Sequence, residues 1–440
     1  MRLRQGEVVE LSVAGIGGAG DGVAQWQGVP VFLPFTVPGD RLRARLGARR
    51  GSGFEGRVVE LTHSGPGRVP APCSHFGQCG GCALQHLDLD LYRSVKLGRL
   101  LNALKRAGVE PGEVEPLRTI PPMRRRARLG LARPRDPRQP VRVGFHERFR
   151  HELVDLRECL VLEPALFEFA GELRRLGPDL LPPGGAAEAT LTRTDSGIDL
   201  LLEASRPPEI GALEALARLG HDRDLARIVW QARGVEILVA ERRPVRVMLS
   251  GAAVPFPPGA FLQASETAEG ILIDEVRAGV GPRRPALDLF AGLGAFAFAL
   301  AANGPVHAVE GDASAAAALA RAAASAQGIT VEHRDLAHNP LPPETLKDYA
   351  AAVFDPPRAG AARQAAALAV SRLDTVVAVS CNPATFARDA ARLIAGGFCL
   401  QRVAPIDQFV WSPHLELVGV FRRCDPTGCG ERRERGVRRS

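Results

Sequence analysis

The pattern of apolar and polar positions changes twice along the 440-residue chain and divides it into three parts. Residues 1–62 alternate in short runs, such as VVELSVAG and FEGRVVELT, and Gly-rich turns separate these runs. Such alternation is typical of half-buried strands and predicts a small antiparallel β-barrel. Residues 63–260 mix Arg-rich strands with amphipathic helices, one of them starting near Leu89. We therefore expect a mixed α+β central domain there, without an assigned topology.

From residue 261 onward, buried strands alternate with Ala-rich helices such as ASAAAALARAAASAQ. Strands are predicted at ALDLF, VHAVEG, AAVFD and VVAVS, and two more in the stretch RVAPIDQFVWSPHLELVGVFRR. This alternation predicts an α/β, Rossmann-like domain at residues 261–424, with a doubly wound parallel sheet and ligand sites at the carboxyl ends of its strands. Residues 425–440 lack apolar periodicity and are expected to form a disordered basic tail.

Charge narrows the choice of partners. The net charge is +7, and residues 118–150 contain eleven arginines against two acids. Arg side chains match phosphate oxygens, so we favour an RNA-binding surface over a merely solvated charged face. No apolar run is long enough to span a bilayer, and the first residues lack the apolar core of a signal peptide. We expect a cytoplasmic protein without membrane contact. The oligomeric state is not encoded in any motif, and a monomer is expected.

Acidic residues follow three successive strands of the predicted parallel sheet. ALDLF leads into a turn in which Gly292 and Gly294 allow a tight bend before a helix, although such a turn is equally common without a ligand. Asp288 lies in the first strand, Glu310 ends the second and Asp335 follows the third. Glu310 is placed to accept ribose hydroxyls and Asp335 to reach an adenine amino group. Because S-adenosylmethionine has no pyrophosphate, this set suits it better than a nicotinamide dinucleotide.

The stretch VAVSCNPATFARD places a thiol at the carboxyl end of a strand. A lone cysteine is more often a packing residue, but Asn382–Pro383 would fix the direction of Cys381. A thiolate that adds to C6 of a pyrimidine makes C5 nucleophilic enough to accept a methyl group. A base must then remove the C5 proton, and Glu416 is the best candidate, with His414 beside it.

Asp355 ends the fourth strand and is followed by two prolines in FDPPRAG. The prolines stiffen the loop, which suits a carboxylate that must be held at the reacting centre. An ordinary Asp-Pro surface turn is the alternative.

A cysteine-rich loop precedes the first predicted helix of the central part. Four thiols suit either a tetrahedral zinc or an iron-sulfur cluster, and the spacing alone does not separate the two. These four are Cys73, Cys79, Cys82 and Cys159. Cytosolic thiols stay reduced, so the remaining cysteines are expected to be packing or tail thiols without a role. They are Cys399, Cys424 and Cys429.

The motifs DLFAGLGAF, FDPPRAG, VSCNPATFARD and HLE together resemble the RNA uracil-C5 methyltransferases in order and spacing. Within that family the chain looks most like the 23S ribosomal RNA enzymes with a TRAM domain and an iron-sulfur cluster, and the resemblance extends to about Phe421. It implies that Cys381 is the nucleophile and Glu416 the base, and that the four clustered cysteines hold a four-iron, four-sulfur cluster. Implied S-adenosylmethionine contacts are Gln263, Phe290, Glu310, Asp335 and Asp355.

The resemblance leaves several points open. The barrel segment GDGVAQWQGVPVFLPFTVPGD resembles a TRAM domain, while a generic oligonucleotide-binding barrel fits equally. Ala291 and Ala295 replace a cysteine and a polar residue that are common in the family, and FVWSPHLE departs from its usual final motif. Relatives that modify tRNA are generally shorter, which favours ribosomal RNA. The alternatives are a tRNA enzyme, an enzyme that methylates another base or a protein, and a non-catalytic RNA-binding ribosome-assembly factor.

Overall fold

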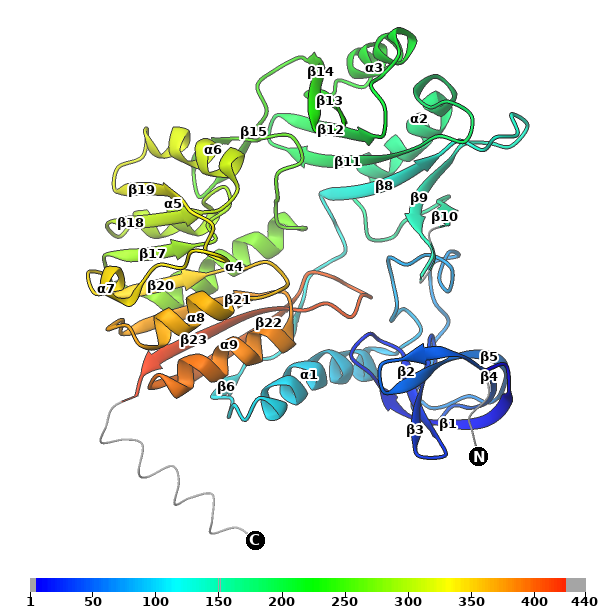
Figure 1. The fold of residues 1–440 in the computed structure, drawn as a ribbon, viewed down its shortest axis with the longest axis horizontal. Coiled ribbons are helices and arrows are strands. Elements are labelled where there is room, and N and C mark those ends of the chain that lie inside the picture. The colour runs from blue at the N-terminus through cyan, green and yellow to red at the C-terminus, as the bar shows by residue number, and fades with distance from the viewer. Residues whose placement is uncertain (1–4, 149, 151, 425–440) are drawn as a thin grey trace.

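The structure is a computed structural model that describes residues 5–424, apart from residues 149 and 151. The predicted basic tail at 425–440, with Cys429, lies outside the described residues. A small barrel, a central sheet and a larger sheet follow one another along the chain (Figure 1). In the described range, no helix combines the length and the apolar character needed to cross a membrane.

The amino-terminal part is a closed five-stranded barrel in the order β1-β2-β3-β5-β4. Its strands are β1 (Val8–Ile16), β2 (Gly22–Trp26), β3 (Val29–Leu33), β4 (Arg41–Arg50) and β5 (Gly53–His63). The alternation read from the sequence sets the faces: Val9, Leu11 and Val13 of β1 point into the barrel core. Closure leaves no unpaired strand edge. The predicted barrel is confirmed, but it is not wholly antiparallel, since β3 and β5 pair in parallel.

The central part is a seven-stranded sheet in the order β10-β9-β8-β11-β12-β13-β14. The strands are β8 (Arg126–Ala132), β9 (Arg142–His146), β10 (Leu153–Asp155), β11 (Ala186–Thr194), β12 (Gly197–Ala204), β13 (Arg227–Ala232) and β14 (Val235–Glu241). Helices α2 (Pro164–Leu180) and α3 (Ile210–Asp222) bury their apolar stripes against one face of this sheet. Exposed Arg128 pairs with Glu188 and Glu203. The mixed α+β prediction is confirmed.

The large sheet runs β19-β18-β17-β20-β21-β23-β22-β6, and the short β7 also pairs with β22. The strands are β6 (Glu113–Val114), β7 (Arg118–Thr119), β17 (Ala286–Leu289), β18 (Val306–Glu310), β19 (Ile329–His333), β20 (Ala351–Phe354), β21 (Thr375–Ser380), β22 (Phe398–Asp407) and β23 (Glu416–Arg423). Strands β17 to β21 are parallel, whereas β23 is antiparallel to both β21 and β22. The predicted strands lie where the sequence placed them.

Helices cover both faces of this sheet, which is why its strands are apolar on both sides. One face packs against α4 (Glu266–Val280), α5 (Ala295–Ala301), α6 (Ala313–Ala323) and the hairpin of β15 (Arg246–Leu249) and β16 (Ala252–Pro255). The other packs against α1 (Leu89–Arg106), α7 (Pro343–Leu346), α8 (Ala362–Ala369) and α9 (Pro383–Ala395). The segments β6, β7, α1 and the hairpin come from the range 63–260, so this layered unit extends beyond the predicted range 261–424.

A buried ion pair fastens α1 to the large sheet. Lys96 and Asp407 are both fully buried, with Nζ 2.6 Å from Oδ1. The Lys96 ammonium also donates to the carbonyls of Phe409, at 3.3 Å, and His414, at 2.5 Å. Tyr92 donates its hydroxyl to the other Asp407 oxygen at 2.5 Å. Helix α1 thus holds the loop that connects β22 to β23.

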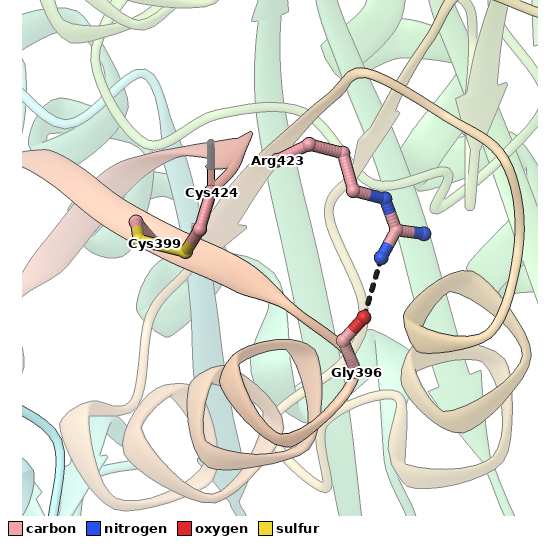
Figure 2. Close-up of a disulfide and its surroundings, with 4 residues drawn as sticks. All are labelled: Gly396, Cys399, Arg423 and Cys424. Atoms are coloured by element: carbon pink, nitrogen blue, oxygen red, sulfur yellow. Dashed lines mark hydrogen bonds between the residues drawn. A yellow bond between two sulfur atoms is a disulfide. The ribbon is translucent and has the colours of Figure 1, made fainter. Parts of the chain in front are cut away.

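The cysteines near the end of the sheet differ from the prediction. Cys399 on β22 and Cys424, just after β23, form a disulfide (Figure 2). The antiparallel register pairs Phe398 with Arg423 and brings the two cysteine Cα atoms to 5.5 Å, a normal spacing for such a bond. The prediction that both are free thiols is wrong, because a separation of 25 residues hides their proximity. Arg423 reinforces this corner by donating to the Gly396 carbonyl.

Replacing Lys96 with Met should lower the free energy of unfolding by about 3–5 kcal/mol, because it leaves the Asp407 carboxylate buried without its cation. Urea denaturation followed by circular dichroism measures the loss. The double variant Lys96→Met/Asp407→Asn is the matched control and should lose less, since no buried charge is left unpaired. Equal stability of the wild type and the single variant would contradict the role assigned to this pair.

Candidate active site

Strand direction brings Cys381 and Glu416 together at one edge of the large sheet. In the antiparallel pairing of β21 with β23, Ser380 lies opposite Leu417. One step further along this register, Cys381 faces Glu416. Burial and then the Glu416 charge are the largest causes that raise the pKa of Cys381. The structure therefore brings the predicted nucleophile and the predicted base side by side.

The Cys381 thiol lies just before the first turn of α9. Asn382 caps this helix, its side-chain oxygen accepting the Ala384 N–H at 3.1 Å, and Pro383 occupies the first turn. Burial and the charges of Glu416 and Asp355 raise the pKa of Cys381 to about 11, and Arg358 offsets part of this rise. The free site thus keeps the sulfur as a thiol, and a nearby positive charge would favour the thiolate.

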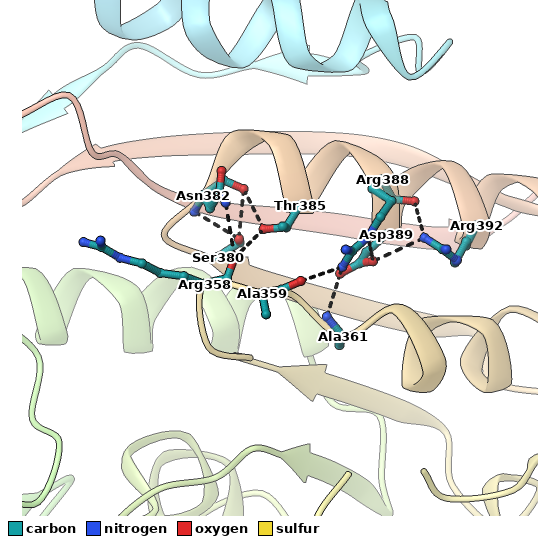
Figure 3. A network of polar contacts seen from close by, with 9 residues as sticks. All are labelled: Arg358, Ala359, Ala361, Ser380, Asn382, Thr385, Arg388, Asp389 and Arg392. Atoms are coloured by element: carbon teal, nitrogen blue, oxygen red, sulfur yellow. Dashed lines mark hydrogen bonds and ion pairs between the residues drawn. The ribbon is translucent and has the colours of Figure 1, made fainter. Parts of the chain in front are cut away.

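Figure 3 shows how the loop after β20 is joined to the start of α9. Asn382 and Thr385 both donate side-chain hydrogen bonds to the Arg358 carbonyl, at 3.2 and 3.3 Å. The buried Asp389 accepts the Ala361 N–H at 2.8 Å. The sequence motifs FDPPRAG and SCNPATFARD therefore form one hydrogen-bonded unit. The sequence analysis did not assign Asp389 a role, because its contact with the Ala361 N–H joins positions 28 residues apart.

Glu416 is almost fully buried at 4 % exposure. Burial and the neighbouring Asp355 carboxylate raise its pKa, while a hydrogen bond with Gln408 lowers it in part. Gln408 also donates to the Gln263 side-chain oxygen at 2.9 Å, and Gln263 donates to Asp355 at 3.4 Å. The two side-chain amides thus connect Glu416 to Asp355, which is one of the predicted S-adenosylmethionine contacts. Gln408 was missed because its motif, IDQF, carries no chemical signature.

His414 is a weaker candidate base than Glu416. Burial lowers its pKa to about 4, and the cations Arg358, Arg99 and Lys96 act in the same direction. The imidazole is therefore neutral at physiological pH.

A cavity of about 90 Å³ lies beside this edge, at the turn between β17 and α5. Gln263, Phe290, Gly292 and Asp355 are among its lining residues. Phe290 and Gly292 adopt positive φ angles of 62° and 56°, which fold the turn back towards the cavity. Three of the five residues predicted to contact S-adenosylmethionine thus line one cavity.

The other two predicted donor contacts lie around its rim or beyond. Glu310 accepts the backbone N–H groups of Gly292 at 2.7 Å and Asp312 at 2.6 Å, so its carboxylate is fixed at the same turn. Asp335 is exposed and pairs with His338 at 2.6 Å. The structure does not bring Asp335 to the cavity.

Buried carboxyl groups surround this region. Asp288 is fully buried in β17, and burial, together with the Asp355 and Glu310 charges, raises its pKa well above the ordinary value. Burial likewise raises the pKa of Asp355. Arg358 is the nearby cation that acts on Glu416. The site is short of positive charge, and a cationic ligand such as a sulfonium would be stabilised there.

The four cysteines predicted to hold a cluster line one small cavity of about 20 Å³. They are Cys73, Cys79, Cys82 and Cys159. All four thiols are free, and within the described part of the chain no three His, Cys, Asp or Glu side chains are arranged to hold a metal ion. The set of donors suits an iron-sulfur cluster. The space between the four thiols is about that of one water molecule. The thiols would therefore have to turn outward to admit an iron-sulfur cluster.

Several known proteins are similar to this chain over most of its length. The family model for tRNA (uracil-5-)-methyltransferases matches residues 260–423. An uncharacterized RNA methyltransferase of Brucella suis is 39% identical over 94% of this chain and 98% of its own length. The 23S rRNA (uracil(1939)-C(5))-methyltransferase RlmD of Halomonas elongata is 34% identical over 97% of this chain and 91% of its own.

The chain belongs to the RNA (uracil-5-)-methyltransferase family. It is accordingly an S-adenosylmethionine-dependent RNA methyltransferase. The fold of this family member is shared with the Pyrococcus abyssi tRNA (uracil-54, C5)-methyltransferase bound to S-adenosyl-L-homocysteine. That structure has a TM-score of 0.71 and 22% identity, and the match covers 94% of this chain and all of that one.

Replacing Glu416 with Gln should lower the pKa of Cys381, because it removes the largest neighbouring negative charge. A lower pKa raises the thiolate fraction at any pH below it, and each pKa unit is a factor of ten. Alkylation of Cys381 by iodoacetamide, followed by peptide mass spectrometry from pH 7 to 10, should be several-fold faster in the variant. Exposed Glu344 offers the control Glu344→Gln, which should leave the rate unchanged. An unchanged or slower rate in Glu416→Gln would contradict the electrostatic account.

Proposed function

We propose that this enzyme methylates C5 of a uridine in RNA through a transient bond between the Cys381 sulfur and C6 of the base. The observation that carries the proposal is the register of β21 and β23, which sets Cys381 beside Glu416. The cavity lined by Gln263, Phe290 and Asp355 lies on the side of Asp355, whose charge acts on both Cys381 and Glu416, and we assign it to the methyl donor.

The residues have distinct tasks in this scheme. The Cys381 thiolate adds to C6, and the electron pair of the C5–C6 double bond moves to form an enolate through the C4 carbonyl. C5 then takes the methyl group from the sulfonium, which leaves as S-adenosylhomocysteine. Glu416 removes the C5 proton, and the returning electron pair expels the Cys381 thiolate. Because burial raises the pKa of Glu416, its carboxylate is a stronger base than an exposed one.

Donor binding supports the first step electrostatically. The sulfonium would bring a positive charge into a region where Asp288 and Glu416 are buried and Asp355 is half-buried. That charge offsets the cost of forming a thiolate at Cys381, so bound donor favours the attack. In the donor complex we assign Gln263, Phe290, Glu310 and Asp355 as contacts. Asp335 would need to turn from His338 to reach the adenine.

We propose large-subunit (23S) ribosomal RNA as the substrate. The Halomonas relative is similar over nearly its full length at 34% identity, against 22% for the Pyrococcus tRNA enzyme. Chain length does not separate the two substrates, since this chain matches the whole of that tRNA enzyme. The barrel, which we assign as a TRAM-like RNA-binding module, therefore argues for RNA rather than for one class of RNA.

We further propose that Cys73, Cys79, Cys82 and Cys159 bind a four-iron, four-sulfur cluster. The cysteines line one cavity and come from the loop before α1 and the segment between β10 and α2. A cluster would tie these two segments together. The role is structural, because Cys381 and Glu416 account for the methyl transfer without a redox step.

Cys381→Ala should abolish both methylation and a denaturation-resistant adduct with 5-fluorouridine RNA, because no sulfur remains to attack C6. Glu416→Gln should reduce turnover about 10²–10⁴-fold, the usual worth of a general base, and should accumulate the adduct with ordinary uridine RNA. Denaturing gels detect the adduct, and nucleoside mass spectrometry of 23S rRNA and tRNA detects 5-methyluridine. Cys424→Ser, another cysteine replacement, should keep activity. Turnover in Cys381→Ala, or RNA binding by the wild type without methylation, would overturn the proposal.

Cys79→Ser should strip iron from the anaerobically purified protein and reduce its solubility and RNA affinity, because folding and cluster binding are coupled. Iron and sulfide assays with visible absorption spectra measure the content. Cys399→Ser is the comparison and should retain full iron. Stoichiometric zinc in place of iron, or normal solubility and RNA affinity in Cys79→Ser, would contradict a structural iron-sulfur cluster.

A further inference from the structure

A groove with a volume of about 960 Å³ runs between α1 and α9 and reaches the barrel at the loop of residues 16–18. It is distinct from the donor cavity and from the cysteine cavity. Small residues form much of its floor, among them Gly98, Ala103, Ala391 and Ala395. They leave room for a ligand between the two helices. Figure 1 shows α1 and α9 as neighbours, with the barrel beyond the start of α1.

The groove is strongly basic. Arg99 and Arg106 of α1 line one wall, and Arg388 and Arg392 of α9 line the other. None of the described residues that line it is acidic. Asp389 partly neutralises Arg388 and Arg392 from behind, at 2.9 and 3.6 Å. Its charge and shape thus suit a chain of phosphates.

Arg99 has a hydrogen-bond donor that is not used within the described part of the chain. One of its terminal nitrogens is buried and has no hydrogen-bond partner among the described residues. Burial lowers the pKa of its guanidinium. Arg99 is half-buried, so its guanidinium is partly desolvated, and an anionic ligand in the groove would offset that cost.

The groove also leads to the reacting centre. Asn382, the residue after Cys381, belongs to the groove wall. On the α1 side, Arg99 lies close enough to His414 to lower its pKa. A strand of RNA whose target base reaches Cys381 would therefore continue into the groove.

We propose that this groove binds the single-stranded RNA segment next to the target uridine, with Arg99, Arg106 and Arg392 contacting its phosphates. The inference rests on the proposed function and adds where the flanking nucleotides lie. The α9 part of the wall spans Asn382 to Ala395, about 20 Å at 1.5 Å per residue, which is room for several nucleotides. Phosphate contacts give affinity and register, while the pocket at Cys381 selects the base.

The first test compares the double variant Arg99→Gln/Arg106→Gln with Arg277→Gln. Arg277 is exposed in the last turn of α4, on the opposite face of the large sheet. The RNA probe is a fluorescent uridine-containing hairpin, titrated from 50 to 200 mM salt. The groove variant should bind at least tenfold more weakly, and its log–log salt slope should shrink by about 0.7 for each lost phosphate contact. Arg277→Gln should bind like the wild type, and neither variant should lose melting temperature or donor binding.

The second test fixes the RNA register. A hairpin with 5-fluorouridine as the target is trapped on Cys381, and 4-thiouridine placed two to six nucleotides away is photo-crosslinked. Crosslinks to peptides within residues 94–107 or 382–395 support the groove. Crosslinks confined to other segments, or unchanged affinity and salt slope in Arg99→Gln/Arg106→Gln, overturn it in favour of another occupant.

The two proposals fail in distinguishable ways. A wild-type enzyme that forms neither 5-methyluridine nor the adduct refutes the proposed function. The salt titration needs no adduct, so it still decides whether the groove binds RNA. Methylation that persists with unchanged RNA affinity in the groove variant refutes the groove alone.

Discussion

The antiparallel insertion of β23 beside β21 is the constraint on which the site depends. In a purely parallel sheet every strand would present its carboxyl end at this edge. Because β23 runs the other way, its first residue, Glu416, meets the residue that follows the last position of β21, Cys381. Two groups that the chain separates by 35 positions thus become neighbours through backbone pairing. Backbone hydrogen bonds, rather than mobile loops, set their relative position.

Charge balance explains why the site suits its donor. Asp288 and Glu416 are buried and Asp355 is half-buried, all three pKa values are raised, and Arg358 is exposed. In the free protein these groups weaken the folded state as the pH rises through their pKa values, because ionisation then leaves charge in a poorly solvated region. A bound sulfonium reverses this penalty. A bound methyl donor should therefore favour both the Cys381 thiolate and the stability of this edge, and a thiolate at Cys381 should in turn raise the affinity for the donor.

Sequence reasoning succeeded where a local pattern determined the outcome. Apolar periodicity located the barrel and the strands, and residues at strand ends, such as Phe290 and Asp355, lie where parallel topology requires. It failed where the decisive contact is distant in sequence. The Cys399–Cys424 disulfide depends on the β22–β23 register, and Gln408 acts through Gln263, 145 positions away. Asp335 shows the converse: its position after a strand was correct, but a local bond to His338 turns its side chain elsewhere.

Helix α1 connects substrate binding to catalytic geometry. Its buried face carries Lys96, which holds the carbonyls of Phe409 and His414 and so fixes the loop that ends at Glu416. Arg99, three residues later, is its neighbour on the helix surface and faces the groove. Burial is the largest cause that lowers the pKa of Lys96, and the Arg99 charge adds to it. A phosphate drawn to Arg99 would weaken this added repulsion. RNA in the groove would thereby strengthen the Lys96–Asp407 ion pair, which fixes the loop that carries the general base Glu416. Helix α1 thus takes part both in binding the flanking RNA strand and in positioning Glu416.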